Sequence, residues 1–247
     1  MKFEHLPVID TMIALYQKPR DMFRFKDYLQ TLTGGDNNNL ELPIMGFNPM
    51  AKEHILEKLI ALKTLNADKI IEETLEQINK NIKELNGETF KVVFNVPDDL
   101  KGGWTDFYTS DYGCKFKIKN FANRHFCIPL FWSSDEISQE SIKQIIVEFC
   151  YRTVYFKQNL INENLEDHVK QEIYVAQQSK SSSKLTKQEF DFLNIFYETH
   201  KNSAHFPLLL NFFYSDSASE KLGYPSLGIK TKMAGFEFAK ALAQAQI

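Results

Sequence analysis

The chain has 247 residues and a formal net charge of −3, with 43% hydrophobic and 25% charged residues. These values are ordinary for a folded globular protein and exclude general disorder. Acidic and basic residues are interleaved, so we expect no basic surface that could neutralise many phosphates, and nucleic acid is not a predicted partner.

The sequence carries no sign of secretion or of a membrane segment. Nowhere do about 18 apolar residues run together, as a membrane span would require. The N-terminus holds Glu4 and Asp10 and lacks the basic region and apolar run of a secretory signal. Three widely spaced cysteines, Cys114, Cys127 and Cys150, suit a reducing compartment better than a disulfide framework. We therefore predict a cytoplasmic protein with no membrane partner.

Amphipathic helices are predicted throughout the first third of the chain. Their apolar residues recur at three- and four-residue steps, as one buried face of a helix requires. Gly34 and Gly87 follow two of these patterns and are typical helix stops. Asn48 and Pro49 read as the N-cap and first residue of another. The predicted helices cover 6–16, 22–32, 49–60 and 71–85.

The periodicity changes at Thr89, where apolar and polar residues begin to alternate. Alternation over 90–96 predicts a strand with one apolar face, and Pro97 ends it. A second strand is expected over 114–118 and a third over 125–132. Antiparallel pairing is the simplest topology, although the long connection between the first two strands leaves another order open.

The stretch 138–158 predicts a central helix whose apolar face is too wide for a surface position. Its narrow polar line contains Gln144, Glu148 and Arg152 at four-residue spacing, and Glu148 precedes Arg152 in the better orientation for an ion pair. Charged side chains on such a helix must be paired or face a wet cavity. A structural ion pair and a functional site are therefore both open.

Further helices are expected after this one, over 165–176, 186–197, 207–214 and 232–246, with a serine-rich linker at 179–184. The predicted fold is α+β and mainly helical, with a small sheet of about three strands in the middle of the chain, packed against the central helix. We expect one domain over 1–247, made of a helical part (1–88), the sheet and central helix (89–158) and a second helical part (159–247).

The connection 97–113 is the most site-like segment, because long loops in compact domains often serve binding. Trp104 and Tyr108 combine flat rings with polar tips, and Thr105 is a further predicted ligand contact. Asp106 can accept hydrogen bonds from a ligand. Alternatively, Asp106 caps local backbone donors and the aromatic rings cover the edge of the sheet.

Our first hypothesis is a pocket for a small, anionic molecule under this connection. Arg124 and Arg152 would hold the anionic group, beside a wall formed by the aromatic residues of the loop. Asp106 or Glu148 would be the general base if the protein is an enzyme, a question that the sequence leaves open. The alternative is a non-enzymatic protein that forms homo-oligomers through its N-terminal helices or its Phe-rich C-terminal third.

No metal site is predicted, and the sequence identifies no cofactor. His125 and Cys127 would share one face of a strand and Cys114 could join them from a neighbouring strand. No CxxC or HExxH spacing accompanies them, so a core position is the favoured interpretation.

Overall fold

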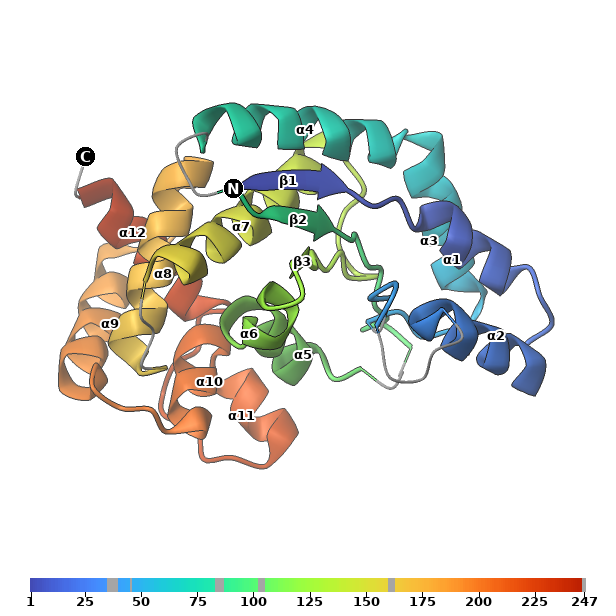
Figure 1. The fold of residues 1–247 in the computed structure, drawn as a ribbon. Coiled ribbons are helices and arrows are strands. Elements are labelled where there is room, and N and C mark those ends of the chain that lie inside the picture. Colours follow the sequence, from blue (N-terminus) through green and yellow to red (C-terminus); the bar gives the residue numbers. More distant parts are fainter. Residues whose placement is uncertain (35–39, 45, 83–86, 102–104, 160–162, 246–247) are drawn as a thin grey trace. The chain divides into compact units, whose positions relative to one another are not determined.

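The computed structural model describes residues 1–34, 40–44, 46–82, 87–101, 105–159 and 163–245. The chain is mainly helical with a small three-stranded sheet, as the sequence predicts (Figure 1). Contacts divide it into two compact units, Met1–Cys150 and Tyr151–Ile247, and the single-domain prediction stays a prediction. In the parts of the chain described above, no helix has both the length and the apolar character needed to cross a membrane.

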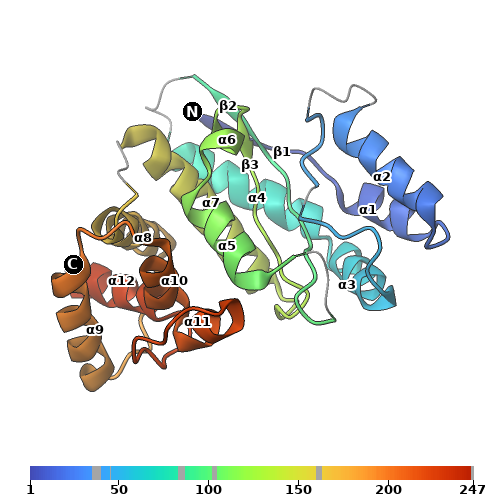
Figure 2. The same ribbon diagram turned by 90° about the horizontal axis from the view of Figure 1, so that it is seen from below.

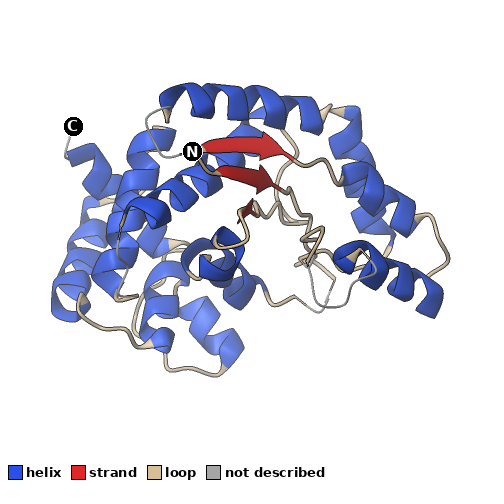
Figure 3. Ribbon diagram, in the orientation of Figure 1, coloured by secondary structure: helices blue, strands red, loops and turns tan. Residues whose placement is uncertain are grey.

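The first unit contains the sheet. Its strands lie between helical connections, and Figure 3 shows how small the sheet is beside them. In chain order its elements are β1 (Lys2–His5), α1 (Ile9–Tyr16), α2 (Met22–Thr33), α3 (Glu53–Thr64), α4 (Ala67–Asn81), β2 (Thr89–Val92), α5 (Phe107–Phe116), α6 (Lys119–Ala122), β3 (Phe126–Cys127) and most of α7 (Gln139–Gln158).

All three strands run parallel, in the order β1-β2-β3, so the prediction of antiparallel pairing is wrong. Phe3 lies opposite Phe90, and Val92 lies opposite Cys127. Parallel neighbours require a crossover connection, which is usually helical. Helices α1 to α4 provide it between β1 and β2, and α5 and α6 provide it between β2 and β3.

Strand β1 lies at the edge of the sheet and before the first predicted helix (6–16), in the part of the chain (1–88) for which only helices were predicted. Helix α4 runs alongside it (Figure 1), and the Asn79 amide forms two hydrogen bonds of 2.8 Å with the backbone N–H and C=O of Phe3. The side chain thus satisfies edge groups that would otherwise be open to another strand. With only Phe3 buried in its four residues, β1 has too short an apolar pattern to be recognised from sequence.

The strand predicted over 114–118 is also wrong, because most of this stretch belongs to α5. Asp106 caps the helix by accepting a hydrogen bond of 2.9 Å from the backbone N–H of Thr109. Asp111 and Lys115, one turn apart, form a buried ion pair of 2.6 Å. The spacing of Asp111 and Lys115 is therefore that of a helix, although the apolar residues of 114–118 alternate with lysines as they would in a strand.

The predicted central helix is confirmed as α7. Ser138 acts as its N-cap, since its Oγ accepts a hydrogen bond of 3.0 Å from the N–H of Ser141, and Ile142 is fully buried. Burial raises the pKa of Cys150, as does its hydrogen bond to Cys127. That bond places α7 against β3 within the first unit.

The second unit is helical in its described residues. Thr186 and Glu189 form a capping box at the start of the helix predicted over 186–197, and the helix predicted over 207–214 is confirmed. Gly235 allows a close approach of two helices, because a Cβ there would lie only 2.6 Å from the ring of Phe213. Besides the end of α7, its elements are α8 (Leu165–Ser179), α9 (Lys187–His200), α10 (Phe206–Tyr214), α11 (Asp216–Leu222) and α12 (Ala234–Ala245), seen from below in Figure 2.

Ser215 joins α10 to α11 in a strained conformation. Its φ of 75° and ψ of 177° lie in a region that is almost exclusive to glycine. The residue is fully buried, and its backbone N–H donates a hydrogen bond of 2.7 Å to the carbonyl of Asn211. Its Oγ has no hydrogen-bond partner among the described residues.

We predict that Ser215→Gly is more stable than Ser215→Ala by about 1 kcal/mol, because only glycine relieves the strain at Cβ. Both variants delete the hydroxyl, so the comparison isolates the backbone. Urea unfolding of the two proteins measures the difference. Equal stabilities would show that the strain is absent.

Candidate functional site

Beyond their regular parts, β2 and β3 remain hydrogen-bonded as far as their carboxyl ends. Asn95 bridges to Leu130, and the backbone N–H of Ser133 donates to the carbonyl of Pro97 at 2.9 Å. This last bond brings Asp98, the next residue after Pro97, beside Ser133. In open parallel sheets, ligands bind outside the carboxyl ends of the strands.

Asp98 is the most buried charged group at these strand ends, with 1% of its surface exposed. Its Oδ1 accepts a hydrogen bond from His54 Nε2 at 2.9 Å and lies 3.1 Å from Ser133 Oγ, whose single proton has a closer acceptor in Asp99 Oδ1. The backbone N–H groups of Leu100 and Lys101 also donate to Oδ1, at 3.1 and 3.3 Å. Its Oδ2, by contrast, has no hydrogen-bond partner among the described residues.

Asp99 is tied to the end of β3 by both of its oxygens. Ser133 Oγ donates to Oδ1 at 2.8 Å, and the backbone N–H of Ser134 donates to it at 3.0 Å. Ser134 Oγ donates to Oδ2 at 2.6 Å. Since Asp99 is half-buried and Ser134 is exposed, the polar group reaches solvent on this side.

Lys58, on α3 one turn after His54, completes the polar group. Its Nζ donates to the backbone carbonyl of Ser133 at 3.2 Å and to that of Asp135, and it lies 4.8 Å from the ring centre of Phe131. We call these side chains the carboxyl-end cluster: His54, Lys58, Asp98, Asp99, Ser133, Ser134 and Asp135.

Burial and hydrogen bonding set the charges of this cluster. Burial opposes ionisation of Asp98, but the hydrogen bonds from His54 and the two backbone N–H groups outweigh it and lower its pKa. Burial lowers the pKa of Lys58, although Asp135 and Asp99 oppose that shift. Burial also raises the pKa of Asp135.

The contact with Asp98 selects one tautomer of His54. An ionised carboxylate has no proton to donate, so the hydrogen in the 2.9 Å contact belongs to His54 Nε2. In the neutral ring, Nδ1 then carries the lone pair, and this atom has no hydrogen-bond partner among the described residues. Such an imidazole can accept a proton at Nδ1.

Asp106 and Tyr108, two of the residues predicted in the 97–113 connection, lie at the start of α5. Asp106 caps that helix, in line with the alternative interpretation of this residue. Thr105 is half-buried, as is Tyr108, whose ring lies 5.2 Å from that of Phe107. Trp104 lies outside the described residues.

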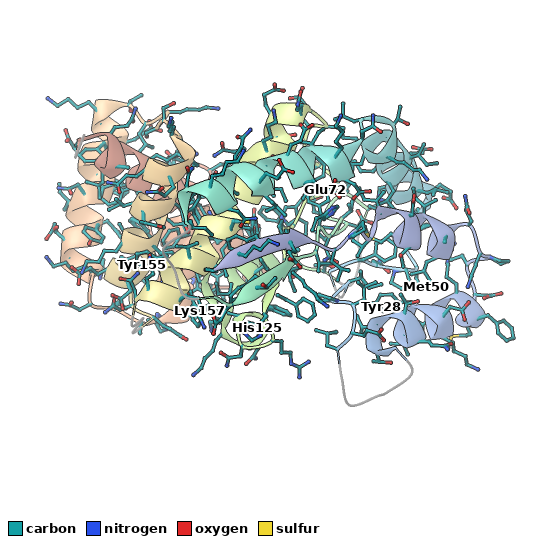
Figure 4. The ribbon with its side chains drawn as sticks, turned by 45° about the horizontal axis from the view of Figure 1, so that its top comes forward. Tyr28, Met50, Glu72, His125, Tyr155 and Lys157 are labelled. Atoms are coloured by element: carbon teal, nitrogen blue, oxygen red, sulfur yellow. The ribbon has the colours of Figure 1, made fainter. Side chains whose placement is uncertain are left out.

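The predicted charged residues lie in different surroundings. Arg124 is exposed. Its neighbour His125, which directly precedes β3 in the chain, is labelled in Figure 4. Glu148 accepts a hydrogen bond of 2.7 Å from Gln144 on the same face of α7. Arg152 is buried and forms a two-pronged pair with Glu172 of α8, with Nε–Oε1 and Nη2–Oε2 distances of 2.8 and 2.6 Å. The predicted pair of Glu148 with Arg152 stays a prediction.

Sequence reasoning missed His54 and Asp98 as site residues, although Asp98 lies in the segment that it favoured. The available signal was positional: Asp98 and Asp99 directly follow one apolar run, and Ser133 and Ser134 directly follow another. Parallel strands place such residues together, whereas the assumed antiparallel pairing places them at opposite ends. His54 belongs to a helix far away in sequence and gave no local signal.

Two other features bear on function. In the described part of the chain, no group of three or more His, Cys, Asp or Glu side chains is arranged to hold a metal ion. A shallow apolar groove of about 610 Å³ is lined by residues of α3 and its C-terminal end, among them Ile60 and Leu65, and by Ile137.

Comparison of the chain with protein-family models, with curated proteins and with solved structures finds no match. The case for function therefore depends on the geometry of the chain itself.

The pair of Arg152 and Glu172 predicts a strongly non-additive stability effect. Glu172→Gln should cost about 3 kcal/mol, because it leaves a buried guanidinium without its counter-charge. The double variant Arg152→Met with Glu172→Leu should lose less stability than the sum of the losses in the single variants Arg152→Met and Glu172→Leu. Urea unfolding gives each value, and strict additivity would contradict a coupled structural pair.

Asp98 predicts a dependence of stability on acid pH. Because folding lowers its pKa, Asp98 stabilises the folded state above its ordinary pKa of 3.8, and this contribution is lost as pH falls through the lowered value. The stability of the wild type should therefore fall more steeply than that of Asp98→Asn in this range. Urea unfolding at a series of pH values checks it, and parallel curves would refute the stabilising role.

Proposed function

We propose that the unit Met1–Cys150 binds a small polar molecule at the carboxyl-end cluster, beside the start of the 97–113 segment, and that His54 accepts a proton from it. The observation that carries this proposal is the hydrogen bond between His54 Nε2 and Asp98 Oδ1. It leaves one ring nitrogen and one carboxylate oxygen without partners among the described residues.

Unsatisfied buried polar atoms argue for a ligand because they are costly. A buried donor or acceptor without a partner loses about 1–3 kcal/mol of hydration that is not replaced. A bound molecule that supplies the missing contacts would recover this free energy. Such incomplete polar groups are common where a protein binds or transforms a substrate.

The proton transfer itself requires only groups that the cluster contains. Asp98 orients the ring of His54 through their contact. His54 Nδ1 would take a proton from an acidic N–H, O–H or C–H group of the ligand, leaving an imidazolium and the deprotonated ligand. A general base of this type contributes about 10²–10⁴-fold to a reaction rate.

This proposal keeps the small-molecule site of the sequence analysis but assigns its chemistry to other residues. Asp106 is engaged as a helix cap and Arg152 as the partner of Glu172, so neither is included. The strand ends around Asp98 are held together by hydrogen bonds from Lys58 to the carbonyl of Ser133 and from the Ser133 hydroxyl to Asp99.

A ligand screen followed by variants tests the proposal. A small polar compound that binds only the folded state should raise its stability by about 2.7 kcal/mol at 100 times its Kd, and thermal unfolding detects this. Compounds found in this way are then measured on His54→Gln and Asp98→Asn. The glutamine retains a donor for Asp98 and lacks the proton-accepting ring nitrogen.

We expect Asp98→Asn to weaken binding about tenfold or more, since hydrogen bonds to charged groups contribute about 1.5–3 kcal/mol. The matched control is Asp191→Asn, the same substitution at an exposed site on α9. His54→Gln should lose less of its affinity for the ligand than of its rate of converting the ligand. Binding that survives equally in Asp98→Asn and the control would contradict the proposal.

Self-association stays the alternative. The groove on α3 favours it, because Ile60 is 49% exposed there. Size-exclusion chromatography with light scattering decides between a monomer and an oligomer.

A further inference from the structure

Asp98 offers a ligand a single acceptor atom. Its Oδ1 already receives donors from His54 Nε2 and from the backbone N–H groups of Leu100 and Lys101. Its Oδ2 is buried and has no partner among the described residues. Whatever completes this carboxylate must therefore donate a hydrogen bond to one oxygen.

The charges of the neighbouring groups also favour a ligand that donates hydrogen bonds and is positively charged. Asp98, Asp99 and Asp135 contribute three carboxyl groups, whereas Lys58 is the ammonium group of the cluster and is directed at backbone carbonyls. Positive charge on a ligand would be attracted to this cluster, and a carboxylate or phosphate would be repelled.

The shape of the acceptor distinguishes among cations. A guanidinium pairs best with two oxygens of one carboxylate, and Oδ1 of Asp98 is already occupied. Calcium and magnesium require about six or more oxygen ligands. Among the described residues, no acidic group of three or more side chains is arranged for a metal. A primary ammonium is a compact point charge and can direct one N–H at one oxygen.

We propose that the ligand of the carboxyl-end cluster is a small primary amine, bound as its ammonium ion through a hydrogen bond to Asp98 Oδ2. This inference rests on the proposed function and specifies its ligand class. It replaces the anionic ligand that the sequence led us to expect, for which Arg124 and Arg152 were the predicted contacts.

Three probes with four carbon atoms each test the ligand class: n-butylamine, n-butanol and n-butyrate, titrated into the chain of 247 residues at neutral pH by calorimetry. We expect n-butylamine to bind at least about tenfold more tightly than n-butanol, and n-butyrate not to bind, because only the amine has both the donor and the positive charge. Tighter binding of n-butyrate, or equal binding of all three, would overturn the inference.

Variants then connect the amine to Asp98. Asp98→Asn retains an oxygen for the existing donors and places an amide NH₂ at Oδ2, so the affinity for n-butylamine should fall at least about tenfold. Asp191→Asn should bind n-butylamine as the wild type does. An unchanged affinity in Asp98→Asn would place the amine elsewhere and overturn the inference.

The probes do not depend on the variants, so misfolding of Asp98→Asn leaves the amine inference testable on the wild type. Failure of the inference is also distinct from failure of the proposed function. If n-butylamine does not bind but another compound class does, and its binding is lost in Asp98→Asn, the site stands and the amine class is wrong. If compounds of every class bind the variant and the wild type equally, both are wrong.

Discussion

The parallel hydrogen-bonded ladder between β2 and β3 is the constraint on which the candidate site depends. Each bond of a parallel ladder advances both strands in the same direction, so the two chains leave the sheet at the same end. The bond from the Ser133 N–H to the Pro97 carbonyl is the last of this series, and the side chains that follow it form the cluster. In an antiparallel pair, Asp98 and Ser133 would leave opposite ends of the sheet and no such cluster could form.

Helix α3 adds what the strands cannot provide. The strand ends contribute carboxylates and hydroxyls, whereas both basic groups of the cluster, His54 and Lys58, come from one face of this helix, four residues apart. They donate to buried oxygens, His54 to Asp98 and Lys58 to the carbonyl of Ser133, which would otherwise lack some of their hydrogen-bond partners. The contact of His54 with Asp98 also favours the ionised form of this carboxylate and selects the tautomer of His54.

Two buried charged groups in this protein differ in a way that bears on function. The two-pronged contact of Arg152 with Glu172 gives each charge its counter-charge in good geometry, which is how a structural pair offsets the cost of burial. Asp98 is buried to a similar degree but has one oxygen saturated and the other without a described partner. A charge held against its counter-charge in this geometry is typical of structure, whereas a carboxylate held ionised with one oxygen lacking a described partner is the stronger indication of a ligand.

The sequence by itself determined the mainly helical character, the positions of most helices and the central helix α7, because hydrophobic periodicity and capping residues such as Ser138 and Thr186 are local signals. It also indicated the segment 97–113, which contains Asp98. Only the tertiary structure decided the strand direction, the edge strand β1, the helical state of 114–116 and the contact of Asp98 with His54. These features depend on contacts between residues far apart in the chain, such as Phe3 with Asn79 and His54 with Asp98, and local periodicity carries no information about which distant segments meet.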